Sequence, residues 1–152
     1  MQHPLRISRK IEYGLRAMAC LAAQVGQTPL PFREIARRMG VPQDFLAKIL
    51  KTLVSRELVH STRGAHGGYR LTKPAKEITF LDVIEAVEGP IMLNVCQDTS
   101  HEGCNMSRSC TLFGVWKRGQ EKMLEVYRSV TLDQLAMAEL REDEPLRSVA
   151  TL

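Results

Sequence analysis

The sequence predicts a mainly α-helical fold with a small β-wing: a winged helix-turn-helix domain followed by a long C-terminal dimerisation helix. Three observations predict it. Two short amphipathic segments flank a tight glycine turn, a glycine-rich hairpin follows them, and a long amphipathic segment comes near the C-terminus. At 152 residues, the chain suits one domain, or one small domain with an arm.

The first helix is expected over residues 11–25, with Gly26 closing it. Its apolar residues recur at helical spacing: Ile11, Leu15, Met18, Ala19 and Ala22. Cys20 lies within this segment among alanine and leucine residues. We therefore expect Cys20 to be a small buried core residue and not a metal ligand.

A helix-turn-helix is predicted next, with a first helix over 32–39, a break at Gly40 and a second helix over 43–55. The first helix should bury Ile35, Ala36 and Met39. The inner stripe of the second should be Phe45, Leu46, Ile49, Leu50 and Leu53. Its outward face carries groups that suit base edges and phosphates: Gln43, Asp44, Lys48, Lys51 and Thr52. A merely solvated helix face would show the same pattern.

The hairpin is expected to form from strands at about 58–62 and 69–71, with three glycines in the connection. It would present Arg63, His66 and Arg70 to the DNA backbone or minor groove, although His66 could equally be an idle loop histidine. Because a hairpin of this kind directly follows a helix-turn-helix, the order favours binding of double-stranded DNA over docking of a protein. The net charge of +4 permits an acidic partner but is weak evidence alone.

A short helix is expected within 78–90, where Thr79 and Asp82 have capping-box spacing and Gly89-Pro90 ends it. After Cys110, helical spacing resumes through a longer set of apolar residues: Leu112, Val115, Trp116, Met123, Leu124 and Tyr127. The turn over 131–140 is expected to pack weakly. The apolar face of the long helix needs cover, and a second copy of the chain is the simplest cover.

Three of the four cysteines lie in one polar loop, at Cys96, Cys104 and Cys110, separated by seven and then five residues. This spacing does not match the paired CxxC pattern of structural zinc. Three thiolates fit an iron–sulfur cluster that lacks one protein thiolate, which suits a sensor. Zinc remains a competitor, and free surface thiols are the remaining alternative.

The sequence argues against a membrane protein, a secreted protein and an enzyme. No stretch is apolar enough to span a membrane, and the basic "RISRK" before "AMACLAA" imitates a signal peptide poorly because Glu12 and Arg16 interrupt it. A cytoplasmic location is therefore expected, where clustered cysteines bind metal or sense redox state. The sequence holds no second set of acid–base or nucleophilic residues, so we expect neither an enzyme nor a small-molecule substrate.

Several segments together resemble the Rrf-two superfamily of bacterial iron–sulfur transcriptional regulators, the IscR/NsrR/RirA-like proteins. They are "LRISRKIEYGLRAM", "FLAKILKTLVSRELV" and "RGAHGGYRLTKPAKEITFLDVIEAVEGP", followed by the three-cysteine loop. The resemblance covers roughly residues 5–135. It implies a homodimeric winged-helix repressor or activator whose long C-terminal helices cross, with each cluster near the dimer interface and the DNA-binding domain of the partner.

The resemblance also bears on the fourth cluster ligand. IscR-like members take a histidine three residues after the third cysteine, and this chain has Phe113 there. NsrR-like members use a carboxylate from the first helix of the other subunit, and the matching residue is Glu12. Glu12 could instead be an ordinary charged residue near a helix start, and His101 in the loop is the alternative ligand.

The sequence thus predicts four regions: a winged DNA-binding domain with its linker helix over 5–89, a cluster-binding loop over 90–110, a dimerisation helix and C-terminal turn over 111–140, and a disordered tail over 141–152. The predicted protein is a homodimer whose operator binding is controlled by a cluster that senses iron, redox state or nitric oxide. Of the cluster types, [4Fe–4S] is slightly favoured over [2Fe–2S]. The alternative is a zinc- or thiol-based winged-helix protein that acts through protein partners.

Overall fold

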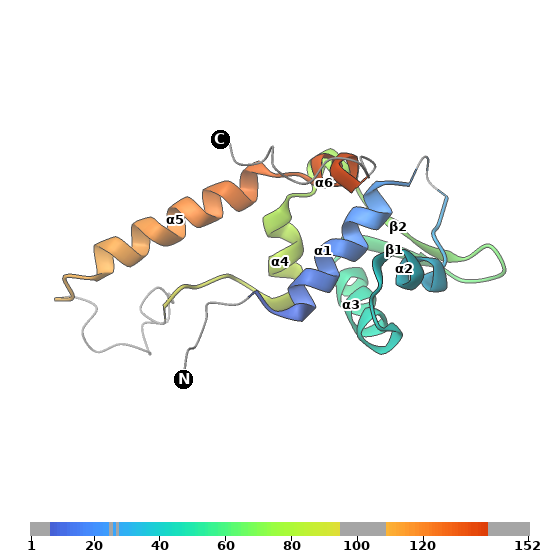
Figure 1. Cartoon of the computed structure of the whole chain (residues 1–152), viewed down its shortest axis with the longest axis horizontal. Helices are drawn as coiled ribbons and strands as arrows, with labels where there is room; N and C mark the ends of the chain where they lie inside the picture. Colours follow the sequence, from blue (N-terminus) through green and yellow to red (C-terminus); the bar gives the residue numbers. More distant parts are fainter. Residues whose placement is uncertain (1–6, 25, 27, 95–108, 140–152) are drawn as a thin grey trace.

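Helices dominate the computed structural model, which describes residues 7–24, 26, 28–94 and 109–139 (Figure 1). The elements are α1 Arg9–Ala22, α2 Phe32–Met39, α3 Gln43–Ser55, β1 Val59–Thr62, β2 Gly68–Leu71, the 3-10 turn η1 Ala75–Glu77, α4 Phe80–Glu88, α5 Phe113–Ser129 and α6 Leu132–Glu139. The predicted helical fold with a two-stranded wing is confirmed. Within the described ranges, no helix is both long and apolar enough to cross a membrane.

Helix α1 begins earlier and ends earlier than the predicted 11–25. It begins at Arg9 because Ser8 is its N-cap, whose hydroxyl oxygen accepts a hydrogen bond from the Ile11 amide at 3.2 Å. It ends at Ala22, and the amide of Ala23 donates back to the carbonyl of Ala19. Cys20 is only 2% exposed, so its predicted place in the core is confirmed.

Helices α2 and α3 have the predicted bounds, and Gly40 between them adopts the left-handed conformation with φ +59°. Four of the predicted inner residues of α3 are at most 1% exposed: Leu46, Ile49, Leu50 and Leu53. The prediction for Phe45 is wrong, because its side chain is 55% exposed. At 100° per residue Phe45 lies on the flank of this stripe, where its ring makes a T-shaped contact with Tyr13. Met39 is only partly buried.

The wing is an antiparallel hairpin of β1 and β2, in which Val59 pairs with Leu71 and Thr62 with Gly68. Leu30 adds a short third segment, since its amide donates to the Tyr69 carbonyl at 2.8 Å and its carbonyl accepts in return at 2.9 Å. A Cβ atom on Gly68 would lie 2.4 Å from the Leu30 carbonyl oxygen, so a side chain there would push Leu30 away from β2. Close approach of the backbone therefore explains this glycine.

Helix α4 starts with the predicted capping box, in which Thr79 and Asp82 each accept a hydrogen bond from the other's amide. The chain returns to this point after α5, where the amide of Phe80 donates to the Val130 carbonyl at 2.8 Å. Helix α6 then packs against α1 and buries Leu132 completely. The expectation of weak packing in this segment is therefore wrong: α6 completes the core of the winged domain.

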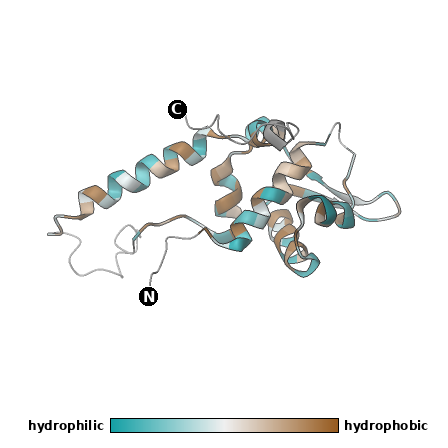
Figure 2. Cartoon of the chain, in the orientation of Figure 1, coloured by the Kyte–Doolittle hydropathy of each residue, from teal (hydrophilic) through white to brown (hydrophobic). Residues whose placement is uncertain are grey.

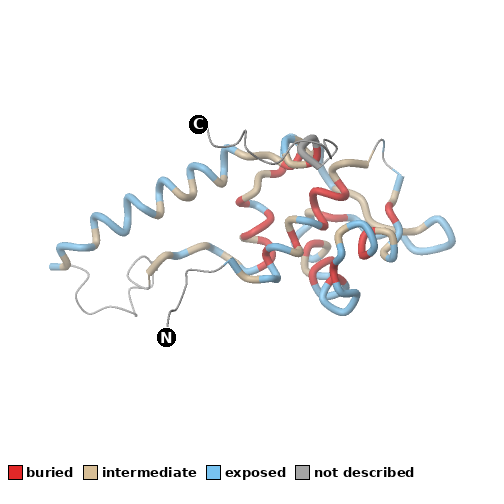
Figure 3. Tube along the Cα trace, in the orientation of Figure 1, coloured by how far each residue is buried: buried red, intermediate tan, exposed pale blue. Residues whose placement is uncertain are grey.

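Helix α5 extends away from the other helices and contacts α4 (Figure 1). None of its residues is buried, in contrast to α1, α3 and α4 (Figure 3). Apolar and polar residues alternate along it (Figure 2), and Val115, Trp116 and Val126 are 57%, 44% and 59% exposed. Among the residues that the structure describes, none therefore buries the apolar side of α5.

The position of α6 generates a prediction about stability. Replacing Leu132 with Ala should lower the free energy of unfolding by about 3 kcal/mol, because it leaves a cavity between α6 and α1. Urea unfolding followed by circular dichroism at fixed protein concentration measures this change. Leu135→Ala on the same helix is the matched control, since Leu135 is only partly buried and should lose about 1 kcal/mol. Equal stability of the Leu132 variant and the unaltered chain would contradict the packing described above.

Candidate functional site

The outward face of α3 is polar and cationic. Gln43, Asp44, Lys48 and Lys51 are all exposed, on a helix whose opposite side is fully buried. Thr52 is half-buried, and its hydroxyl donates to the Lys48 carbonyl at 3.0 Å. Four of the five predicted side chains are thus free to meet a ligand, whereas the hydroxyl proton of Thr52 is already engaged within the helix.

The wing follows α3 directly, and its first strand packs against that helix. Arg63 and His66 lie in the connection between the strands and are exposed. Arg70 lies on β2, pairs in register with His60 and is half-buried. The three predicted wing residues therefore differ in accessibility. Arg63 and His66 are exposed at the tip of the hairpin, and Arg70 is half-buried within the strand pair.

Helix α2 carries three arginines that the sequence interpretation did not single out: Arg33, Arg37 and Arg38. All three are exposed. Glu34 accepts hydrogen bonds from Arg37 and from Arg38, each with a closest distance of 2.7 Å. The hydrogen bond from Arg37 is the main cause that lowers the pKa of Glu34 to about 2. The pattern "FREIARRM" contains this signal, because the arginines fall outside the buried Ile35 and Ala36.

Of the predicted thiolate ligands, Cys96 and Cys104 lie outside the described residues, as does His101. Cys110 precedes α5, is half-buried and forms no disulfide. Among residues 7–24, 26, 28–94 and 109–139, no three His, Cys, Asp or Glu side chains come together in a way that could hold a metal ion.

Glu12 lies in the first turn of α1 and is exposed. Its carboxylate accepts a hydrogen bond from Arg16 at 2.6 Å, a pair in which both side chains are 49% exposed. The carboxylate is thus accessible from outside the chain and already has a cationic neighbour one turn away. Phe113, which occupies the position of the histidine in IscR-like proteins, is the first residue of α5 and is half-buried.

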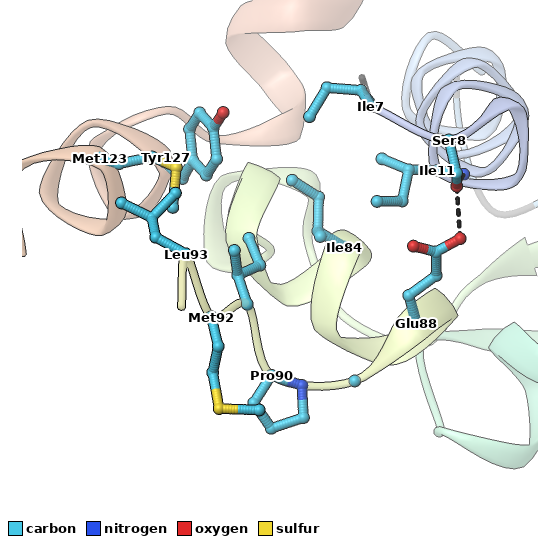
Figure 4. A pocket seen from close by; sticks show the side chains of 12 residues that line it. Ile7, Ser8, Ile11, Ile84, Glu88, Pro90, Met92, Leu93, Met123 and Tyr127 are labelled. Atoms are coloured by element: carbon cyan, nitrogen blue, oxygen red, sulfur yellow. Dashed lines mark hydrogen bonds between the residues drawn. The ribbon is translucent and has the colours of Figure 1, made fainter. Parts of the chain in front are cut away.

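Hydrogen bonds from Ser8 and Lys10 hold the C-terminal end of α4, and a hydrogen bond with α5 holds the stretch that leads from α4 into the cysteine loop. The Lys10 ammonium donates to the Val87 carbonyl at 2.5 Å, and the Ser8 hydroxyl donates to the Glu88 carboxylate (Figure 4). The Leu93 amide donates to the side chain of Gln120 at 2.9 Å.

Between these attachments lies a cavity of about 530 Å³ (Figure 4). Most of its lining is apolar, including Ile11, Ile84, Leu93, Met123 and Tyr127. The start of the loop is therefore held between the N-terminal turn of α1 and the middle of α5.

Comparisons with known proteins agree with this arrangement. The Rrf2 family model, described as an iron-dependent transcriptional regulator, matches residues 7–138. Protein aau3 of Rhizobium meliloti (strain 1021) is 33% identical over 94% of this chain and 96% of its own length.

Two solved structures are also similar. CymR, the global cysteine regulator of B. subtilis, is 33% identical with a TM-score of 0.73, over 89% of this chain and 98% of that chain. IscR of T. potens is 30% identical with a TM-score of 0.72, over 93% of both chains. The resemblance inferred from the recognition helix and the wing is confirmed, and the chain belongs to the Rrf2 family of helix-turn-helix transcriptional regulators, which bind DNA and are not enzymes.

Proposed function

We propose that the chain forms a cytoplasmic homodimer whose binding to an operator is controlled by an iron–sulfur cluster that responds to iron, redox state or nitric oxide. The observation that carries this proposal is the polar and cationic face of α3 beside the wing, in a chain with three cysteines in one loop. The face supports the DNA-binding part, and the cysteines support the sensing part.

The DNA-binding part of the proposal rests on polar and charged side chains that the firmly packed helix α3 holds in place. The buried stripe of α3 fixes the helix, so its outward side chains can enter the major groove with little loss of backbone freedom. Lys48 and Lys51 would meet phosphates, while Gln43 and Asp44 would read base edges. Exposed Arg63 at the tip of the wing would contact the neighbouring backbone or the minor groove. The arginines of α2 would add contacts where the first helix of the motif crosses the phosphate backbone.

Dimerisation is supported by the uncovered side of α5. Exposed side chains such as Val115 and Trp116 would leave apolar surface in water if the chain were alone. The α5 helix of a second copy would cover this surface through a self-complementary contact. Residues 111–129 would then be the dimerisation segment, and residues 5–89 would be the winged domain, completed in the same chain by α6.

The donor set of the chain fits an iron–sulfur cluster. Thiolates of Cys96, Cys104 and Cys110 would hold it, and the Glu12 carboxylate of the partner subunit would complete the coordination. Cys110 is in no disulfide and Glu12 is exposed, so both can take these roles. When bound, such a cluster supplies chemistry that responds to oxidants, nitric oxide and iron supply.

Control of DNA binding would pass through the attachments of the loop. The C-terminal end of α4 is tied to α1 by Lys10, and Leu93 at the start of the loop is tied to α5 by Gln120. A change of ligation in the loop would therefore alter the position of α1 relative to α5, and with it the spacing of two recognition helices in a dimer. A rigid winged domain needs only a small rotation to change this spacing.

The cluster ligands can be tested by anaerobic reconstitution followed by iron and sulfide assay. Replacing Cys96, Cys104 or Cys110 with Ala should strip the cluster, and Cys20→Ala is the control that should keep it with a modest loss of stability. Glu12→Ala should give a cluster that assembles but decays faster in air. Brown protein with absorbance near 400 nm is expected for the unaltered chain. A colourless protein with stoichiometric zinc, or retention of the cluster in the Cys104 variant, would contradict the proposal.

The interaction of Lys51 with a phosphate can be tested through the salt dependence of operator binding. Lys51→Ala should weaken binding and lower the log–log salt slope by about 0.9 for each phosphate that the lysine neutralises. Lys122→Ala on α5 removes the same charge from a side chain that is 79% exposed and paired with Glu125, and it should leave the slope unchanged. Equal slopes for the Lys51 variant and the unaltered chain would show that Lys51 does not contact DNA.

The oligomeric state can be tested with charges on the exposed side of α5. The double variant Val115→Glu, Trp116→Glu should be a folded monomer, because two carboxylates would be desolvated at each contact between copies. Light scattering after size-exclusion chromatography measures the mass, and circular dichroism measures the helix content. Lys122→Ala is again the control and should stay dimeric. A double variant that remains a dimer would place the contact elsewhere.

A further inference from the structure

Large apolar side chains that are strongly exposed occur at two places in the described part of the chain. Six of them belong to α5 and the neighbouring segments: Ile7, Met92, Leu112, Val115, Trp116 and Val126. The seventh is Phe45, 55% exposed, on the first turn of α3. The proposed dimer contact concerns the exposed side chains of α5 and gives no reason for an exposed phenyl ring on the recognition helix.

Phe45 is held in place although it is exposed. Its ring meets Tyr13 of α1 edge-on, with a centroid distance of 6.2 Å and an interplanar angle of 65°. The next residue in the chain, Leu46, is fully buried, so the backbone at this point is fixed as well. An aromatic ring with two side-chain torsions and a firm neighbour loses little conformational entropy when it meets a ligand.

The neighbours of Phe45 indicate which ligand it meets. Gln43 and Asp44 precede it in the first helical turn, and Lys48 follows it one turn later, all of them exposed. The N-terminal turn of a recognition helix is the part that reaches base edges. A phenyl ring offers no hydrogen bond, and the apolar group that the major groove presents is the C5 methyl group of thymine.

We propose that Phe45 is a specificity-determining residue that contacts a thymine methyl group in the major groove of the operator. This inference rests on the proposed DNA-binding function. Phe45 would recognise thymine by burying the methyl group against the ring, while the polar residues beside it recognise hydrogen-bonding groups. The edge contact with Tyr13 would keep the ring at one angle to the groove.

The test removes the methyl group alone. An operator is first selected from random duplexes with the full-length chain, and each thymine is then replaced singly by deoxyuridine, which keeps every hydrogen-bonding group. For the unaltered chain, at least one replacement in each half-site should weaken binding roughly three- to fivefold. For Phe45→Ala, the same duplexes should bind with equal affinity, and Phe45→Leu should retain part of the discrimination.

Lys122→Ala is the control, because it alters a strongly exposed side chain on α5, far along the sequence from α3. It should keep the ratio of thymine to deoxyuridine affinities even if overall affinity falls. The inference is wrong if no methyl group matters, if Phe45→Ala still discriminates, or if Phe45→Ala dissociates the dimer. If the unaltered chain selects no operator, the proposed function itself fails and the inference with it.

Discussion

Close packing around α1 is the constraint on which the rest of the structure depends. This one helix contacts α2, α3, α4, α6 and β2. The side chains on its buried side therefore have to be small where these neighbours come close. Small residues make this possible: Ala17 and Cys20 are at most 2% exposed, and Gly14 faces α4. A Cβ atom on Gly14 would lie 2.9 Å from a methyl group of Val87, so even alanine would move the two helices apart.

The same packing gives the chain a rigid surface for recognition. Because α3 is anchored by side chains that are essentially inaccessible, its outward face can carry uncompensated charge and an exposed aromatic ring without loosening the fold. The ion pairs of α2 show a different arrangement, in which one carboxylate orients two arginines in solvent. Such exposed pairs add little to stability. Their effect is instead to hold the guanidinium groups of Arg37 and Arg38 close to Glu34 on the surface of α2.

The apolar surface that remains uncovered lies on the other side of the molecule. After α5 the chain rejoins the winged domain through the bridge between Thr79 and Thr131, so the C-terminal end of α5 is tied to the core while none of its residues is buried. The end of α4 is held by a hydrogen bond from Lys10 of α1, and the stretch that follows α4 is held by a hydrogen bond between Leu93 and Gln120 of α5. The recognition surface, the apolar helix and the loop therefore share α1 and α4 as common supports.

The sequence by itself determined the local elements of this protein. The turn at Gly40, the capping box of Thr79 and Asp82, the glycine hairpin and the apolar stripe of α3 depend on residues close together in the chain, so periodicity and turn chemistry predict them. The family was also readable from the sequence, because its motifs are continuous segments. The cysteine ligands remain a sequence-based expectation, since two of the three lie outside the described residues.

Only the tertiary structure decided which faces are covered. Phe45 fits the apolar stripe of α3 by spacing, yet its side chain stays 55% exposed, with its ring in a T-shaped contact with Tyr13. Conversely, Leu132 lies in a short segment with a weak pattern, yet it is fully buried because α5 returns the chain to α1. The pairing of Leu30 with Tyr69 also joins distant segments. Whether a face is buried depends on which distant element of the chain packs against it, and helical periodicity gives no information about that packing.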